Sequence, residues 1–235
     1  MDNEAEAKRE EHPMPDIKIH VLHTGAVCVS PDPPFGGDRC NPVKASGIFQ
    51  PRGSRLWLPV SAYLIEHPRG LFLVDTGWAR AMSPEGVFDK RAQVKSLGSL
   101  VLYEVNQGQV PLGQCVDEQL AAMGMKTSDI DAVLLTHLDC DHANGIVQVK
   151  DARRFVVAAD EVRFASKITN RVRYNRDWWG MVELDAFEWN DDEGPAGKEQ
   201  QKASLAWIRE QSLDPLCVES LANHDPDIEP HVIEL

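Results

Sequence analysis

The sequence predicts an α/β or α+β fold with central strands, because strand and helix patterns alternate along most of the chain. Residues 58–77 hold two apolar runs around the turn "HPRG", which is the signature of a β-hairpin. Residues 114–125 place apolar side chains at helical spacing and close on a glycine, so they predict a helix. The run at 130–136 is short and apolar and predicts a buried strand.

The chain before and after the hairpin is less regular. Residues 17–22 alternate apolar and polar side chains and predict an opening strand, with 26–29 as its partner across Gly25. The stretch 30–56 is rich in proline, glycine and arginine and predicts a long loop. Residues 78–113 carry no single pattern, although "KSLGSLVLYEV" has partly helical character.

Fewer elements follow in the second half of the chain. Residues 153–159 predict a strand, and a helix is expected from about Asp160 to Ile168. The pattern collapses after Trp189, where residues 190–204 contain no run that could form a strand. A short amphipathic helix in "SLAWIREQS" and a terminal strand in "HVIEL" close the sequence.

The composition is that of a globular protein and limits its partners. The chain has 235 residues, of which 43% are hydrophobic and 26% charged, enough for a substantial core. A net charge of −13 argues against nucleic acid or an anionic membrane as a partner, because both favour basic patches. No apolar stretch approaches the roughly 20 residues of a membrane-spanning helix. We interpret residues 1–15 as a disordered tail and residues 16–235 as a single domain.

Cysteine usage and the N-terminal residues predict a cytoplasmic protein. The five cysteines are odd in number and lack CxxC spacing, which suits free thiols in a reducing compartment. The N-terminal stretch is polar and lacks the basic-then-apolar layout of a signal peptide.

The stretch "THLDCDHANG", residues 136–145, contains most of the candidate metal-binding residues of the sequence. Directly after the apolar run "AVLL", it packs His137, Asp139, Asp141 and His142 into six positions. Imidazole and carboxylate ligands suit zinc, manganese or non-haem iron. An exposed Asp/His turn that caps the next helix is the alternative, but it does not account for four ligand-type residues after a buried strand. The loop therefore predicts a metal site.

Three motifs together resemble the metallo-β-lactamase-fold hydrolases, and most closely the branch that includes the N-acyl-homoserine lactonases. They are the loop at 136–145, the upstream "LVDTG" (73–77) and the downstream "ANHDPD" (222–227). The resemblance covers roughly residues 17–189 and 205–235. It implies an αββα sandwich, two metal ions, and hydrolysis of an ester or lactone by metal-activated water.

The resemblance also implies roles for individual residues. The implied ligands are His137 and Asp139 for one metal, and Asp141, His142 and His224 for the other. Asp75 of the "DTG" motif would support these ligands from behind and orient a ring. Asp141, once free of a metal, would act catalytically by passing a proton to the leaving alkoxide.

Two features depart from the family pattern. Asp139 stands where the family has a histidine, and a carboxylate is a harder ligand that shifts metal preference away from zinc. The family's further histidine in a Gly-His-Ser/Thr turn, and its bridging Gly-Asp, have no counterpart between His142 and His224. We therefore interpret the chain as a family member with an internal deletion around residues 190–204, which truncates the second half of the sandwich.

An alternative is a divergent relative that recruits substitute carboxylates, namely Asp185, Asp191, Asp192 or Asp225. We favour the deletion, because carboxylates in a flexible acidic stretch would be poorly preorganised. A catalytic zinc usually has three protein ligands, so five candidates fill one site and leave the other with two. We expect one divalent metal, with zinc favoured over manganese or iron, and a second metal bound weakly or not at all.

Two functions follow from this interpretation. The first is a metal-dependent hydrolase that acts on a small-molecule ester or lactone, such as an acyl-homoserine lactone. The second is a non-catalytic or impaired, truncated metal-binding protein. In that case the loss of strands would expose sheet edges and favour aggregation or a homodimer.

Several other side chains have both a structural and a functional interpretation. Tyr174 and the Trp178–Trp179 pair suit an acyl-binding groove and a satellite core equally well. For His23 and Cys140 we favour packing roles. Arg171, Arg173 and Arg176 form a basic cluster. They could neutralise an anionic substrate, but in an acidic protein we favour a solvated or salt-bridged surface.

Overall fold

The structure, a computed structural model, describes residues 17–32, 46–47, 51–188 and 207–235. The predicted tail at 1–15 and the segment 190–204 lie outside the described residues. The strands are β1 (Lys18–Val29), β2 (Leu56–His67), β3 (Gly70–Val74), β4 (Gln107–Gln109), β5 (Ala132–Leu135), β6 (Phe155–Ala158), β7 (Leu184–Phe187) and β8 (Val232–Glu234). The α-helices are α3 (Lys90–Leu97), α4 (Leu100–Val105), α5 (Val116–Ala122), α6 (Cys140–Ala143) and α7 (Ala159–Ala165).

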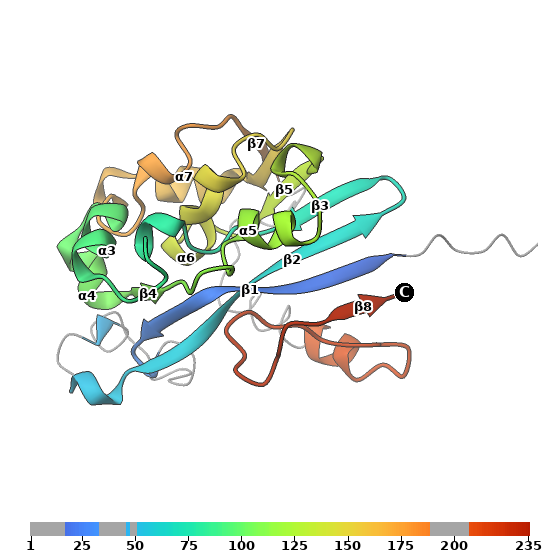
Figure 1. Cartoon of the computed structure of the whole chain (residues 1–235), viewed down its shortest axis with the longest axis horizontal. Helices are drawn as coiled ribbons and strands as arrows, with labels where there is room; N and C mark the ends of the chain where they lie inside the picture. Colours follow the sequence, from blue (N-terminus) through green and yellow to red (C-terminus); the bar gives the residue numbers. More distant parts are fainter. Residues whose placement is uncertain (1–16, 33–45, 48–50, 189–206) are drawn as a thin grey trace, which may run out of the picture.

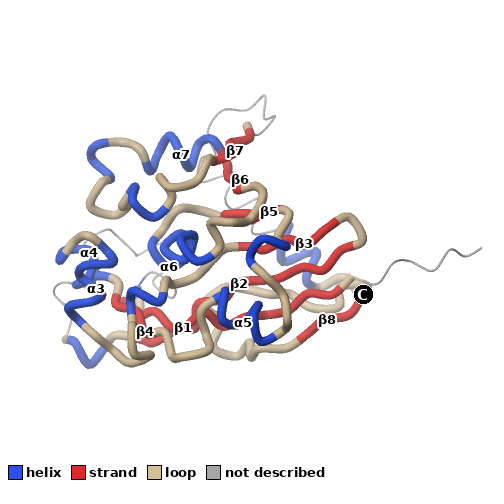
Figure 2. The backbone as a smooth tube through the Cα atoms, turned by 45° about the horizontal axis from the view of Figure 1, so that its top comes forward, coloured by secondary structure: helices blue, strands red, loops and turns tan. Residues whose placement is uncertain are grey.

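All the strands of the described residues form one sheet in the order β4-β1-β2-β3-β5-β6-β7, with β8 paired to β1. Strands β1, β2 and β3 are antiparallel neighbours, whereas β3, β5, β6 and β7 run parallel. In Figure 1 helices α3 to α7 gather on one side of the β1–β2 pair, and the C-terminal segment, with its own short helix, runs on the other side of β1. Figure 2 shows the same sheet crossing the molecule, with β8 beside β1.

The parallel pairing of β3 with β5 positions the loop at 136–145. The register matches Phe72 with Ala132 and Val74 with Leu134, so both strands end at the same edge of the sheet. Side chains that follow the two strands therefore meet there, as in other open α/β sheets. This pairing depends on a core of fully buried side chains, among them Leu64, Leu73 and Val133.

The predicted α/β class is confirmed, and so are the hairpin of β2 and β3 and the helix at α5. The predicted partner strands at 17–22 and 26–29 are wrong, because both stretches belong to the single strand β1. Gly25 is a bulge in this strand instead of a turn. It has φ +104°, and a Cβ there would lie 2.5 Å from the carbonyl oxygen of Gln109, so only glycine lets β4 approach.

Short helical turns connect the larger elements. The 3₁₀ turns are η2 (Arg52–Ser54), η3 (Arg80–Met82), η4 (Thr127–Asp129), η5 (Asn144–Gln148), η6 (Ile168–Asn170) and η7 (Arg176–Trp178). The helix expected in "SLAWIREQS" is present over its described part, 207–212, and the terminal strand "HVIEL" is β8. No helix in the described ranges is long and apolar enough to cross a membrane.

The aromatic residues between β6 and β7 belong to the core. Tyr174, Trp178 and Trp179 are each 4% exposed and pack in the main hydrophobic cluster. The indole N–H of Trp178 donates to the carbonyl oxygen of Ser96 in α3, at 3.0 Å. Of the two interpretations of these aromatics, the structure supports a core role, since all three side chains are almost fully buried in the main cluster.

Two glycines allow the loop after β3 to lie directly against α6 and η5. Thr76 donates its backbone N–H and its hydroxyl to the carbonyl oxygen of His142, at 3.0 and 2.6 Å. Gly145 donates its backbone N–H to Gly77, at 2.9 Å. A Cβ on Gly145 would lie 2.2 Å from the carbonyl oxygen of Thr76, and one on Gly77 would lie 1.9 Å from Oγ1 of Thr24. Neither position accepts a side chain without a shift of the backbone.

We expect Gly145→Ala to lower the free energy of unfolding by about 2 kcal/mol or more, because the added methyl group meets backbone on a rigid neighbour. Urea unfolding followed by circular dichroism measures the change. Gly53→Ala is the matched control, since a Cβ there meets no atom within 4 Å. Equal stability of the two variants would contradict the proposed close approach.

Candidate metal centre

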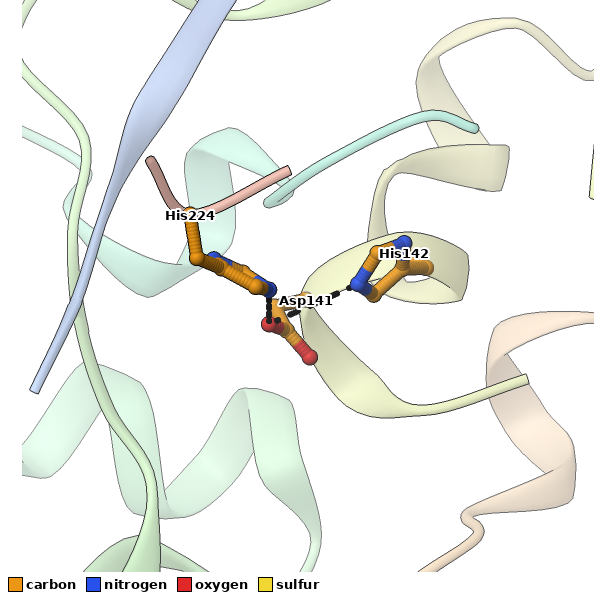
Figure 3. A group of neighbouring side chains, drawn as sticks. All are labelled: Asp141, His142 and His224. Carbon is orange, nitrogen blue, oxygen red and sulfur yellow. Dashed lines mark ion pairs between the residues drawn. The ribbon is translucent and has the colours of Figure 1, made fainter. Parts of the chain in front are cut away.

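Three side chains from two distant parts of the chain meet beside α6 (Figure 3). Asp141 and His142 lie in α6 itself, and His224 comes from the C-terminal segment. One donor atom of each residue lies within 4.8 Å of the others. Asp141 Oδ2 is 3.2 Å from His224 Nε2 and 3.7 Å from His142 Nε2. Two imidazoles and one carboxylate form the ligand set of many catalytic zinc sites, so this group fits a divalent metal.

Electrostatics favour a charged carboxylate and a protonated histidine in the metal-free site. Burial raises the pKa of the Asp141 carboxyl, but the charge of His142 and the hydrogen bond of His224 outweigh burial and hold this pKa well below its ordinary value. Burial lowers the pKa of His142, but the charge of Asp141 and the hydrogen bond of Asp75 outweigh burial and raise it to about 9. Asp141 is therefore an anion at neutral pH, the form in which a carboxylate binds metal.

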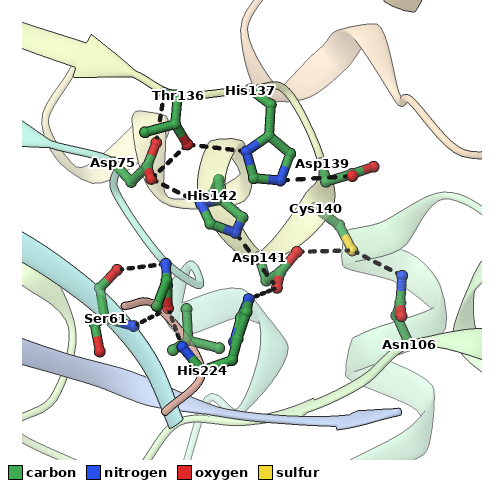
Figure 4. Close-up of polar contacts among 12 residues, drawn as sticks. Ser61, Asp75, Asn106, Thr136, His137, Asp139, Cys140, Asp141, His142 and His224 are labelled. Atoms are coloured by element: carbon green, nitrogen blue, oxygen red, sulfur yellow. Dashed lines mark hydrogen bonds and ion pairs between the residues drawn. The ribbon is translucent and has the colours of Figure 1, made fainter. Parts of the chain in front are cut away.

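Asp75 fixes the orientation of His142 from behind the ligand group (Figure 4). Its carboxylate accepts from the backbone N–H of Thr136 at 2.9 Å and from the hydroxyl of Thr136 at 2.8 Å. It also accepts from Nδ1 of His142 at 2.8 Å. With Nδ1 engaged, Nε2 of His142 is left to face Asp141. This is the arrangement in which a carboxylate orients a metal-binding imidazole.

His224 is held in place by the residue before it. The Asn223 amide accepts from the backbone N–H of Ser61 at 2.9 Å and donates to the carbonyl oxygen of Ser61 at 3.0 Å. It also accepts from the backbone N–H of His224 at 2.8 Å. Nδ1 of His224 donates to the carbonyl oxygen of Pro59 at 2.8 Å. These contacts attach the C-terminal segment to β2 and direct Nε2 of His224 towards Asp141.

Among the described residues, only Asp75 and His224 combine a side chain with a positive φ, at 58° and 64°. This left-handed conformation is costly for most residues other than glycine, less so for asparagine and aspartate, and it persists where surrounding contacts determine it. Both residues belong to the candidate site. Local backbone strain of this kind is concentrated at functional positions in proteins.

His137 and Asp139 lie next to the three ligands but are arranged differently. The His137 ring is 3.9 Å from the His142 ring between centroids, and its Nδ1 is 2.9 Å from Oγ1 of Thr136. Its Nε2 is 3.6 Å from Oδ2 of Asp139. The Asp139 carboxylate accepts from Arg173, with Nε at 2.6 Å and Nη2 as a second donor. The structure thus brings Asp141, His142 and His224 together and leaves Asp139 in an ion pair.

The sequence did not identify three residues that organise the site. Thr136 stands at the start of the quoted loop and links Asp75 to His137. Asn223 precedes His224 in "ANHDPD", and a polar residue next to a predicted ligand is the signal that could have found it. Arg173 was assigned only to a surface cluster, because it is 34 residues from Asp139 and no spacing connects the two.

The other candidate residues lie outside the ligand group. Asp185 forms an exposed ion pair with Arg154, and Asp225 accepts from the backbone N–H of Asp227 at 3.0 Å. Asp191 and Asp192 fall outside the described residues. Cys140 is 1% exposed, as expected for a packing role. Burial and the charges of nearby carboxylates raise the pKa of its thiol well above the ordinary value, which makes it unreactive.

A cavity of about 460 Å³ lies close to His224. It shares with the site the segment around Pro59, whose carbonyl oxygen contacts His224, and Pro226, which follows two residues later. Among the described atoms, Nε2 of His23 is buried without a hydrogen-bond partner, and His23 lines this cavity. The volume lies within the range of small-molecule sites. Its lining is apolar and polar in similar measure, with Trp57, Leu58, Pro59, Pro111 and Pro226 beside His23, Gln109, Gln114 and Glu229.

Comparison with known proteins identifies the family to which this architecture belongs. Residues 55–197 match the sequence profile of the Metallo-beta-lactamase superfamily, which is more than half of the chain. The chain belongs to the metallo-β-lactamase superfamily. The predicted family is therefore confirmed, and the mixed α/β sheet with its helices matches the metallo-β-lactamase fold.

Several proteins of this superfamily resemble the chain. It is 31% identical over 168 residues to probable metallo-hydrolases of Mycobacterium bovis and Mycobacterium tuberculosis, a match over 70% of this chain and 43% of theirs. An N-acyl homoserine lactone hydrolase with N-hexanoyl-L-homoserine at its catalytic metal centre has TM-score 0.54 at 22% identity. A Bacillus thuringiensis relative with N-decanoyl-L-homoserine bound has TM-score 0.54 at 21% identity. These two likenesses show the fold alone.

The chain is short relative to these members of the superfamily. It spans 43% of the length of the mycobacterial relatives. Each of the two solved structures is covered over 62% of its length, while 76% of this chain is matched. The ligand group and the Asp75 support lie within the shared part of the fold, except for His224, which follows the profile match at 55–197.

We expect Asp75→Asn to weaken metal binding about 10- to 100-fold, because the amide no longer supports His142 as a charged acceptor. Asparagine keeps the size of the side chain and tolerates the left-handed backbone at this position. Competition with a chromophoric chelator measures the affinity for Zn²⁺. Asp185→Asn, which removes a carboxylate far from the ligand group, is expected to keep the wild-type affinity.

In the metal-free protein we expect stability to fall as the pH rises from 6.5, the ordinary value for His142, towards about 9. A histidine with a raised pKa contributes stability that is complete below its unfolded value and is lost as pH passes the folded value. The loss is of the order of 3 kcal/mol. The pKa of Asp141 is lowered from 3.8, so this residue changes the free energy of unfolding only at acidic pH, outside this window.

Urea unfolding in the presence of a chelator, at several pH values across this window, measures that loss. His142→Gln removes the titrating group, so its stability is expected to change little over the same pH values. An equal alkaline loss in the variant would assign the titration to another residue.

Proposed function

We propose that the protein is a metal-dependent hydrolase that acts on an ester or lactone. The observation that carries this proposal is the convergence of Asp141, His142 and His224 within 4.8 Å at the carboxyl edge of the sheet. Membership of the superfamily and the fold of the lactone hydrolases support it. The substrate class follows from the resemblance to those hydrolases, one of which has an acyl-homoserine product at its metal centre.

The ligand residues and their supports have distinct roles in such a reaction. A bound divalent cation would lower the pKa of water and polarise the substrate carbonyl. His142 and His224 would hold the cation through Nε2, since Asp75 and Pro59 engage their Nδ1 atoms. Asp141 stays ionised, so it would serve as a ligand. Once free of the cation, its carboxylate would accept a proton from the attacking water. The leaving alkoxide then takes that proton from the carboxyl group.

The cavity beside His224 supports a substrate with an apolar part. It is lined on one side by Trp57, Leu58 and Pro59 of β2 and on the other by Pro226. An acyl chain placed there would lie along Pro59 and Pro226, beside the segment that carries His224.

A second candidate function is a metal-binding protein with impaired catalysis. The observation that favours it is the exposed apolar surface of the C-terminal segment, where Trp207, Leu213, Leu216 and Val218 are each more than 60% exposed. Exposed apolar side chains of this kind are expected where an internal deletion has removed the strands that would cover them. Such a protein would bind metal at the same three ligands and turn over no substrate.

Turnover of γ-lactones and p-nitrophenyl esters by the purified protein, reconstituted with Zn²⁺, Mn²⁺ or Fe²⁺, tests the hydrolase. His224→Asn is the matched control, since asparagine keeps the left-handed backbone and removes the imidazole. We expect this variant, and Asp141→Asn, to lose activity by about 10²- to 10⁴-fold. Wild-type turnover no higher than that of the His224→Asn variant, with metal bound, would favour the second candidate.

A further inference from the structure

We propose that the Arg173 guanidinium takes the place of a second metal ion, so that the site holds one divalent cation instead of two. The proposal rests on the hydrolase function only in that it describes the same site. Its evidence is the contact of Arg173 with Asp139, the residue that stands between the two histidines of the loop.

The second position would depend on His137 and Asp139. Their Nε2 and Oδ2 atoms are 3.6 Å apart, and the His137 ring lies 3.9 Å from the His142 ring between centroids. Two ligand-type side chains at this spacing, next to the group of Asp141, His142 and His224, would form part of a second metal position. With two protein ligands among the described residues, that position would bind a divalent cation only weakly, and a cation already paired with Asp139 would prevent even this.

Arg173 already neutralises the carboxylate of this pair. It donates Nε to Oδ1 and Nη2 to Oδ2 of Asp139, a two-pronged contact that engages both oxygens. Planar pairs of this type are among the strongest charge-assisted hydrogen bonds. Arginine keeps its charge at every relevant pH, so a divalent cation at this position would meet a fixed positive charge at short range.

Neighbouring residues position the Arg173 side chain. The guanidinium lies 5.0 Å from the centre of the Tyr174 ring, and that ring is buried. Trp178 anchors the following turn to α3 through Ser96, and the backbone N–H of Arg173 donates to Asn170 at 3.0 Å. Arg173 therefore reaches Asp139 from a fixed backbone.

Metal stoichiometry tests the proposal. The full-length protein is stripped with a chelator, titrated with Co²⁺ or Zn²⁺ by calorimetry, and analysed by elemental analysis after gel filtration. We expect one equivalent in the wild type. Arg173→Gln is expected to bind a second, weaker equivalent at millimolar free metal, since it frees Asp139 to act with His137, whereas the wild type stays at one under the same conditions. Spin coupling between two Co²⁺ ions would place the added ion next to the first.

Two variants control the interpretation. Arg171→Gln, an exposed arginine of the same segment, is expected to stay at one equivalent. The double variant Arg173→Gln with His137→Asn is expected to return to one, because the second position then has a single ligand. Circular dichroism and thermal unfolding verify that each variant is folded.

Two tight equivalents in the wild type, or a folded Arg173→Gln variant that stays at one, would overturn the proposal. Turnover is scored separately, so the two hypotheses fail in different ways. If the wild type binds one equivalent, Arg173→Gln binds two, and neither hydrolyses any substrate, this inference holds and the hydrolase function is rejected. If the protein hydrolyses substrate and its metal stoichiometry is the same with and without Arg173, the hydrolase function holds and this inference is rejected.

Discussion

The carboxylate of Asp75 is the constraint on which the candidate site depends. It accepts three hydrogen bonds from the neighbouring strand and its loop, two from Thr136 and one from His142. A buried carboxylate costs free energy unless its oxygens are satisfied, so these contacts fix the relative position of the loops after β3 and β5. The same contacts orient His142, and the positive φ of Asp75 is a local cost that they offset.

A second constraint connects the C-terminal segment to the rest of the molecule. The segment joins the sheet edge through β8, which pairs with β1 from Lys18 to His20. Its polar anchor is Asn223, which mimics a strand partner by bonding both backbone groups of Ser61. His224 reaches Asp141 only because of this anchor. The site is therefore assembled from parts of the chain that are 82 residues apart, and metal binding would link the segment to α6.

Much of the local structure followed from the sequence, and where it did not the cause was a contact with distant residues. Apolar runs and turn residues predicted β2, β3, β5 and β6 because burial on a sheet demands such runs. Gly25 was taken for a turn, although it serves the close approach of β4, which no local pattern encodes. The aromatic pair Trp178–Trp179 could not be assigned until α3 was seen to accept the indole.

The sequence by itself determined the family, the location of the candidate ligands and the support residue Asp75, because these depend on short motifs with fixed chemistry. Tertiary structure decided which candidates act together. His137 and Asp139 precede the other ligands in the same loop, yet the direction of each side chain is set by its partners. Arg173 binds Asp139 across 34 residues, while Asn223 delivers His224 to Asp141. Charge pairing and hydrogen bonding between distant segments thus brought three of the five candidate ligands together.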